Sequence, residues 1–234
     1  MPTRANALAV MAKAPIAGKV KTRLVPPFTR EQAAELYRAL LMDHLEHLSG
    51  LTVAELYLVY TPDSAAPLMK QLAPPNFQCI AQHDGDLGER MNAAFIDLWQ
   101  LGHRNVVVIG SDLPALPLDF LGTAFGLLAT SAPQVVLGPS RDGGYYVVGM
   151  NRPTPEIFQD MTWSHNQVLA QTMKRLAGLG IASELLPTWF DLDTVEDLAY
   201  LQSLSEPATR NAVQRTLSYL QGFGPLDRFN QSLE

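Results

Sequence analysis

The chain has 234 residues, of which 47% are hydrophobic and 17% charged, so it is long enough and apolar enough to bury the core of one domain. Its net charge of −6 argues against nucleic acid or an anionic membrane as a partner, because both are bound by an excess of basic side chains. The single cysteine, Cys79, excludes an internal disulfide framework, no apolar run reaches the roughly 18 residues of a membrane span, and we expect no secretion signal.

The first half of the chain alternates strand-like and helix-like segments. A buried strand is predicted at residues 7–12. A helix is predicted after Thr29, because Thr29 and Gln32 have the spacing of a capping box and the apolar residues that follow recur with a period close to 3.6. Further strands are predicted at 52–61, 77–81 and 105–110, with a helix at 89–101. The run NVVVIG at 105–110 lacks polar alternation, which is typical of a strand covered on both faces.

The second half continues this alternation. It predicts a helix at 116–129, strands at 134–138 and 145–150, a helix at 165–178, a strand at 183–187 and a helix from Thr194. The hairpin-like turn at 141–144 indicates one antiparallel excursion. Together these elements predict an α/β fold, a three-layer α/β/α sandwich with a mostly parallel, Rossmann-like central sheet. We expect one domain over residues 1–234, with a core at about 7–204 and a C-terminal helical tail at 205–234.

A basic loop follows the first predicted strand. The stretch AKAPIAGKVKTRL (12–24) does not have Walker A spacing, since Gly18-Lys19 is followed by Val20. Lys13, Lys21 and Arg23 could still neutralise a phosphate, and Gly18 would let the backbone approach it. The alternative is a solvated surface loop with ordinary charges. The cluster stands out in an acidic chain, so we favour a phosphate-binding loop.

Three aspartates supply candidate metal ligands, because ligands of open α/β sheets bind beyond the carboxyl ends of the strands. Asp112 closes the strand at 105–110, where it could hold a hard cation such as Mg²⁺ or instead cap a helix that begins near Pro114. Asp191 and Asp193 are two residues apart, so they share one face of an extended segment and would repel each other without a cation. We interpret Asp197 as a helix cap of Thr194.

Two further loops contain glycines. Asp142, Gly143 and Gly144 could orient an acceptor, although a plain hairpin turn explains them equally well. Ser164 precedes a helix, either as a cap or as an anion-binding position. Gly85 and Gly88 lie at the start of the helix predicted at 89–101, where they could contact a base or a ribose.

Six motifs taken in order resemble a bacterial family of GT-A-fold glycosyltransferases, some of them associated with arsenosugar biosynthesis. The motifs are AKAPIAGKVKTRL, GDLGERM, GSDLPAL, GPSRDGGYYVVGM, MTWS and FDLDTVEDL, and they span about residues 7–204. The chain is also similar to the phospholactate and phosphoenolpyruvate guanylyltransferases of deazaflavin cofactor biosynthesis, and more distantly to molybdenum-cofactor guanylyltransferases. All belong to the nucleotide-diphospho-sugar transferase superfamily.

The resemblance implies roles for residues that match its motifs. Gly18, Lys21 and Arg23 would meet the nucleotide phosphates, Asp112 and Asp193 would hold Mg²⁺ (or Mn²⁺) with Asp191 as a third ligand, and Gly143, Gly144 and Ser164 would lie near the acceptor. Two departures stand out. Only one glycine precedes Arg23, where sugar nucleotidyltransferases have Gly-x-Gly-x-Arg. A single carboxylate, Asp112, stands where many GT-A glycosyltransferases have Asp-x-Asp.

Three functions remain open at this point. The first is Mg²⁺-dependent nucleotidyl transfer from an NTP to a small phosphorylated acceptor, with Lys21, Arg23 and Asp112 as catalytic residues. Lys21 and Arg23 would stabilise the departing pyrophosphate, and Asp112 would hold the Mg²⁺. The second is glycosyl transfer from an NDP-sugar, with Asp142 as the base. The third is a non-catalytic nucleotide-binding protein. We favour the first, since a strongly basic loop suits a triphosphate, and we expect a cytoplasmic protein, with a homodimer left open.

Overall fold

The computed structural model describes residues 5–132, 134–163 and 165–223, and its centre is a seven-stranded sheet with the order β3-β2-β1-β4-β6-β5-β7. The strands are β1 (Asn6–Lys13), β2 (Glu55–Thr61), β3 (Phe77–Ala81), β4 (Asn105–Gly110), β5 (Gln134–Pro139), β6 (Tyr145–Met150) and β7 (Ala182–Leu185). All neighbours pair in parallel except at β6, which runs antiparallel to both β4 and β5. The predicted α/β class and its one antiparallel excursion are confirmed.

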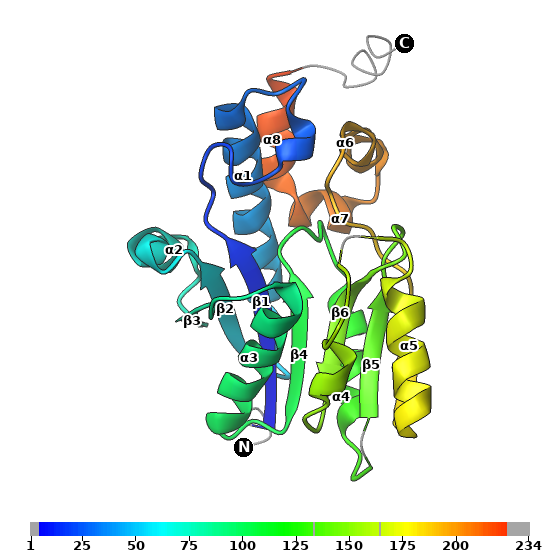
Figure 1. Cartoon of the computed structure of the whole chain (residues 1–234). Coiled ribbons are helices and arrows are strands. Elements are labelled where there is room, and N and C mark those ends of the chain that lie inside the picture. Colours follow the sequence, from blue (N-terminus) through cyan, green and yellow to red (C-terminus); the bar gives the residue numbers. More distant parts are fainter. Residues whose placement is uncertain (1–4, 133, 164, 224–234) are drawn as a thin grey trace.

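Two layers of helices sandwich this sheet (Figure 1). The helices α1 (Arg30–Leu48), α2 (Ala66–Leu72) and α4 (Leu118–Leu128) pack against one face, which presents Leu8 and Leu58. The helices α3 (Leu87–Gln100) and α5 (Val168–Leu179) cover the other face, which presents Ala9 and Val59. Successive strand residues point to opposite faces, so both faces of β1 and β2 are apolar, as the unbroken apolar runs predict.

Side-chain caps set where three helices begin. The predicted capping boxes form at Thr29–Gln32 before α1 and at Thr194–Asp197 before α6 (Val195–Ser203). Asp86 and Glu89 make a further box, which starts α3 at Leu87, two residues before the predicted start. Each box satisfies backbone N–H groups that the first helical turn leaves without partners.

Three predicted starts were too early, and one of them is that of α4, which begins at Leu118 instead of 116. β2 begins at Glu55 instead of 52 because its ladder with β1 begins at the pair Ala7–Glu55. α5 begins at Val168 instead of 165, with Gln167 at its N-cap. The N–H of Leu169 donates to the carbonyl of Gly143 at 3.1 Å, so the start of α5 is tied to the β5–β6 turn.

The C-terminal helices extend the molecule beyond the sheet. α7 (Pro207–Ala212) and α8 (Gln214–Gln221) lie beside α1 and near α6 (Figure 1). A third apolar cluster joins Leu36 and Leu40 of α1 to Leu198 of α6 and Leu217 of α8. The side of α1 that faces away from the sheet is therefore buried as well, in a small core shared with α6 and α8.

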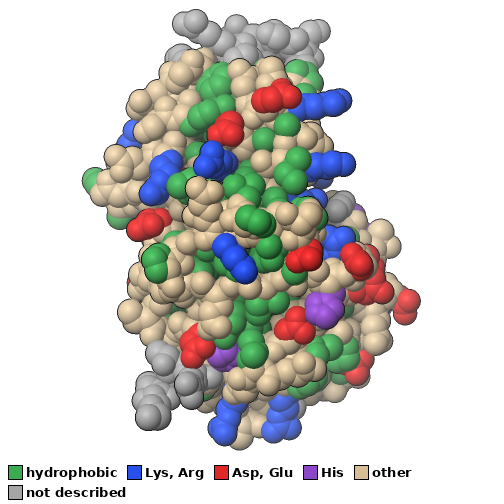
Figure 2. Space-filling view, turned by 90° about the vertical axis from the view of Figure 1, so that its left-hand side faces the viewer, with side chains coloured by type: hydrophobic (Ala, Val, Ile, Leu, Met, Phe, Trp, Pro, Cys, Tyr) green, Lys and Arg blue, Asp and Glu red, His purple; other side chains and the backbone are tan. Residues whose placement is uncertain are grey.

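The surface shows neither a basic stripe on the face viewed nor, among the described residues, a helix suited to a membrane. On the face shown in Figure 2, acidic and basic side chains are interspersed over the described residues and the basic ones do not gather into one stripe. Within the described residues, no helix is long and apolar enough to cross a membrane.

Candidate functional site

The loop after β1 brings a lysine into the interior. Lys21 has φ 46° and ψ 40°, a left-handed conformation that is uncommon outside glycine, directly before a short 3-10 turn at Thr22–Leu24. This conformation aims the side chain inward, and only 3% of it is exposed. A non-glycine residue is held there only when its surroundings compensate for the strain.

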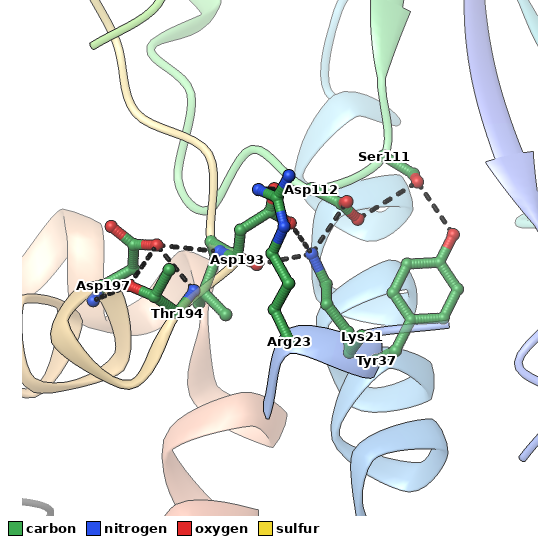
Figure 3. A network of polar contacts seen from close by, with 9 residues as sticks. Lys21, Arg23, Tyr37, Ser111, Asp112, Asp193, Thr194 and Asp197 are labelled. Atoms are coloured by element: carbon green, nitrogen blue, oxygen red, sulfur yellow. Dashed lines mark hydrogen bonds and ion pairs between the residues drawn. The ribbon is translucent and has the colours of Figure 1, made fainter. Parts of the chain in front are cut away.

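The compensation comes from two aspartates on other loops (Figure 3). Lys21 Nζ lies 2.7 Å from Asp112 Oδ2 and 3.0 Å from Asp193 Oδ1, and it also donates to the carbonyl of Leu192. Arg23, whose side chain is 67% exposed, approaches Asp193 from outside at 3.4 Å. One ammonium therefore joins the loop after β1 to the loop after β4 and to the segment before α6.

The electrostatics of this contact favour a charged lysine. Burial by itself lowers the pKa of Lys21, but the carboxylates of Asp112 and Asp193 more than offset it, so the pKa is raised above its usual value. The positive charge of Lys21 is consequently engaged with carboxylates in this structure. Sequence reasoning treated it as free for phosphate.

Asp112 lies at the carboxyl end of β4, as predicted. It does not cap α4, because that helix begins at Leu118 with Pro117 at its N-cap. Its own carbonyl accepts a hydrogen bond from the N–H of Leu192 at 2.9 Å, which fixes the segment carrying Asp191 and Asp193 beside it. The neighbouring Ser111 hydroxyl contacts the Tyr37 hydroxyl at 2.8 Å (Figure 3).

The basic side chains line a first cavity of about 570 Å³ at this edge of the sheet. Its cations come from the end of β1, from the loop that follows and from α3, and they are Lys13, Lys19, Lys21, Arg23 and Arg90. Its carboxylates are Asp86, Asp112 and Asp193. Since Lys21 is engaged with two of these carboxylates and Arg23 contacts one, Lys13, Lys19 and Arg90 are the cations best placed to meet an added anion.

The three glycines predicted for this region have different surroundings. Gly85 lines the first cavity with φ +121°, and a Cβ there would come within 2.4 Å of Glu89. Gly18 has φ +75° beside Arg30, at the turn of the basic loop. Gly88 is buried, and a Cβ there would meet the Trp163 ring at 2.7 Å, so close packing explains this glycine.

A second cavity of about 230 Å³ adjoins the first. Asp112 and Asp193 line both cavities, and Asp142 and Asp191 line the second alone. Burial raises the pKa of Asp191 to about 7, and the charges of Asp112, Asp142 and Asp193 add to the effect. The two cavities thus differ in character, one rich in cations and the other in carboxylates.

The β5–β6 turn shapes the second cavity. Asp142 Oδ1 accepts from the N–H of Gly144 at 3.0 Å and from the Ser140 hydroxyl, so the carboxylate is fixed at the turn. Gly143 has φ +88°, and a Cβ there would lie 2.2 Å from the carbonyl oxygen of Asn166. Gly144 lines the cavity, whereas Gly143 positions α5. The predicted Ser164 lies outside the described residues.

The carboxylates suit a hard divalent cation, although none is preassembled. Among the described residues, no three His, Cys, Asp or Glu side chains are grouped as a metal site. Asp112 and Asp193 nevertheless converge on one cation, the Lys21 ammonium, and two carboxylates with substrate phosphates make a typical Mg²⁺ site. The residues therefore fit Mg²⁺ or Mn²⁺ if Lys21 turns toward a bound phosphate.

Four residues of the site were missed by sequence reasoning. Lys19 was seen within the basic loop but given no role, and Arg90, in the motif GDLGERM, was not considered; its Nε donates to the carbonyl of Gly85 at 2.8 Å. Tyr37 lines the first cavity from α1, and Trp163 lines both cavities. Lys19 and Arg90 carried a usable signal, because each is a cation inside a family motif.

Comparisons with known proteins agree with this architecture. The family described as "Uncharacterized protein conserved in bacteria (DUF2064)" matches residues 44–165. The solved "putative nucleotide-diphospho-sugar transferase" from Desulfovibrio desulfuricans is 31% identical, with 97% of each chain covered and a TM-score of 0.86. Curated proteins gave no match.

More distant solved structures share the fold alone. A cytidylyltransferase from Leptospira borgpetersenii is 11% identical, with 95% of this chain and 96% of that chain covered and a TM-score of 0.57. A 4-diphosphocytidyl-2C-methyl-D-erythritol synthase from Anaerococcus prevotii is also 11% identical, with 85% and 99% covered and a TM-score of 0.54. These two likenesses therefore show a shared fold.

Proposed function

This chain belongs to the DUF2064 family and to the nucleotide-diphospho-sugar transferase superfamily, and from that membership we propose that it transfers a glycosyl group from an NDP-sugar to a small acceptor. One observation carries the proposal. A cavity lined by cations and a cavity lined by carboxylates meet at Asp112 and Asp193. The first suits the diphosphate of a donor, and the second suits an acceptor whose hydroxyl gives up a proton.

The electrostatic balance of the first cavity favours a diphosphate. Lys21 already neutralises carboxylate charge, and Arg23 contacts Asp193. Lys13, Lys19 and Arg90 then provide counter-charge for a leaving group that carries about two to three negative charges, and such fixed charges stabilise the group as it departs. On this balance of charges we place glycosyl transfer before nucleotidyl transfer, the reverse of the order that we favoured on the sequence.

The chain's own residues divide the work as follows. Lys13, Lys19 and Arg90 bind and orient the diphosphate. Asp142, held by the β5–β6 turn, accepts the proton of the acceptor hydroxyl while the hydroxyl oxygen bonds to the sugar's anomeric carbon. The bond from that carbon to the diphosphate breaks, and its electron pair leaves with the NDP.

The aspartates that the two cavities share would hold a divalent cation. Asp112 and Asp193 would hold it, with Asp191 adjacent, and when bound it would supply charge neutralisation for the leaving diphosphate. Lys21, released from the two carboxylates, would then add its charge to those of Lys13, Lys19 and Arg90 around the diphosphate. Tyr37 and Ser111 keep the loop that carries Asp112 in place.

Nucleotidyl transfer from an NTP, with release of pyrophosphate, is the second candidate. The observation that favours it is the number of cations around the first cavity, five in all, which exceeds what a diphosphate needs if Lys21 and Arg23 also turn to the ligand. In that case the same Lys13, Lys19 and Arg90 would neutralise the β- and γ-phosphates.

Product release separates these reactions. The full chain is incubated with Mg²⁺ and NDP-sugars or NTPs, each with a panel of acceptors, and NDP and pyrophosphate are quantified. We expect acceptor-dependent NDP release that falls at least about a hundredfold in Asp112→Asn, with Asp119→Asn, an exposed aspartate on α4, as the control. Pyrophosphate release would establish the second candidate, and neither product from any pair would overturn both.

A further inference from the structure

The second cavity has an unusual charge for a site that must receive an acceptor. Asp112, Asp142, Asp191 and Asp193 line it, and none of the other described lining residues is a lysine or an arginine. His165 is the sole basic side chain among them. Its volume of about 230 Å³ is small beside the roughly 300–1,000 Å³ of typical ligand pockets, so it suits a ligand of about a dozen heavy atoms.

Lys21, which lines the first cavity, contacts Asp112 and Asp193 at 2.7 and 3.0 Å and offsets one of these four charges. Two arginines near the second cavity are engaged elsewhere. The Arg141 guanidinium, next to Asp142 in the turn, stacks over the rings of Phe190 at 5.2 Å and Tyr200 at 4.5 Å. Arg175 of α5 donates to the carbonyls of Gln159 and of Asp160, the latter at 2.9 Å. Neither side chain lines the second cavity, so neither supplies counter-charge to a ligand there.

A divalent cation on Asp112 and Asp193 would not reverse this balance. Asp142 would still face the ligand, and an ionised carboxylate only accepts hydrogen bonds. Its natural partners are hydroxyl and ammonium groups, which donate. A phosphate or carboxylate on the acceptor would bring further acceptor oxygens and like charge into the same small space.

We propose that the acceptor held in the second cavity is a small hydroxylated molecule without a phosphate or carboxylate group, neutral or carrying an amine. The identification of this molecule as the acceptor rests on the proposed transferase function. The preference for an unphosphorylated ligand follows from the residues that line the cavity. It replaces the phosphorylated acceptor predicted from the sequence. Trp163, which lines this cavity too, offers the kind of ring face on which the C–H side of a sugar or polyol packs.

Binding of matched probes tests the preference without knowledge of the nucleotide. The full chain is saturated with Mg²⁺ and pyrophosphate, which fills the first cavity whatever the base. Ligand-observed NMR then compares glucose, glucosamine and glucose 6-phosphate. We expect glucose or glucosamine to bind at least tenfold more tightly than glucose 6-phosphate. Asp142→Asn, which keeps the shape of the side chain, should reduce that ratio at least threefold, and Asp119→Asn should not change it.

Two outcomes would overturn the inference. One is tighter binding of glucose 6-phosphate than of both unphosphorylated sugars to the pyrophosphate-loaded protein. The other is equal binding of all three sugars, or binding of none of them, with the same result in Asp142→Asn. Failure of the proposed function is a separate result, because it would appear as absence of NDP and pyrophosphate release even where the unphosphorylated probes bind.

Discussion

At the scale of single residues, the site depends on one buried ammonium. Lys21 is 171 residues from Leu192 in sequence and 91 from Asp112, yet it contacts both. It is held in a left-handed conformation and is surrounded by carboxylates that would otherwise repel one another. Lys21 therefore has a structural role in addition to any contact with phosphate.

We predict that Lys21→Met destabilises the protein. Removing the ammonium leaves Asp112 and Asp193, which are 33% and 41% exposed, without their shared partner. Because water partly replaces that partner, the free energy of unfolding should fall by about 1–3 kcal/mol in urea titrations at pH 7. Lys19→Met, at an exposed position of the same loop, should change it by less than about 0.5 kcal/mol. Equal stability of the two variants would contradict a structural role for Lys21.

At the scale of elements, turns and caps position the site. The β5–β6 turn fixes Asp142 and ties down the start of α5 through Gly143, and Asp43 of α1 ties down α8. Both ties are hydrogen bonds to backbone groups that would otherwise lack a partner. Each can be removed by one substitution.

Gly143→Ala should disturb the turn and α5 together. The residue has φ +88°, and the new Cβ would lie 2.2 Å from a backbone oxygen, which cannot move aside as a flexible side chain can. We expect a loss of about 1–3 kcal/mol in unfolding free energy. Gly126→Ala, in α4 with open space around it, should instead gain about 0.5–1 kcal/mol. A stable Gly143→Ala variant would mean that the turn readily changes conformation.

Asp43→Ala should release the C-terminal helices from α1. The buried carboxylate accepts from the N–H groups of Arg215 and Thr216 at 3.1 and 2.8 Å, and from the Thr216 hydroxyl at 2.9 Å. Loss of these bonds at the start of α8 should cost about 1–3 kcal/mol.

Hydrogen exchange gives the spatial readout for this variant. Residues 207–221 should exchange faster than in the parent protein, with little change in β1 and β4. Glu35→Ala, at an exposed position of the same helix, serves as the control. Faster exchange throughout the sheet would show that α8 and the sheet unfold as one unit.

At the scale of the whole molecule, acid should destabilise the fold through a buried histidine. His44 of α1 is 1% exposed; burial, and to a smaller extent His47, lower its pKa to about 3, while backbone groups of Gly110 and Leu113 oppose the shift. Because the unfolded chain takes up a proton near pH 6.5 and the folded chain does not, stability is lost as pH falls from about 6.5 toward 3.

The size of this loss can be measured with one variant. Between pH 7 and pH 4.5 the His44 contribution should reach about 2–3 kcal/mol, since each pKa unit corresponds to about 1.4 kcal/mol. His44→Gln should therefore lose that much less stability than the parent protein over the same interval, because all other titrating groups are shared. Identical losses in urea titrations at the two pH values would refute the contribution of His44.

Local sequence patterns predicted most elements of the fold. The strands at 105–110 and 145–150 have the predicted bounds, because runs rich in β-branched and aromatic residues between turn residues mark strands by themselves. The capping boxes at Thr29 and Thr194 formed as predicted, since their contacts span three residues. Starts that depend on a distant partner, those of β2 and α5, were misplaced.

By itself, then, the sequence determined the α/β class, the antiparallel strand and the loops that gather at one edge of the sheet, because hydrophobic period and turn chemistry are local. Tertiary structure alone decided how charge is distributed there. It paired Lys21 with Asp112 and Asp193 and brought Arg90 into the first cavity. It placed Asp142 and Asp191 in the second cavity, where no described lining residue is a lysine or an arginine. Charges interact through space over a few ångströms, and separation along the chain does not reveal which of them meet.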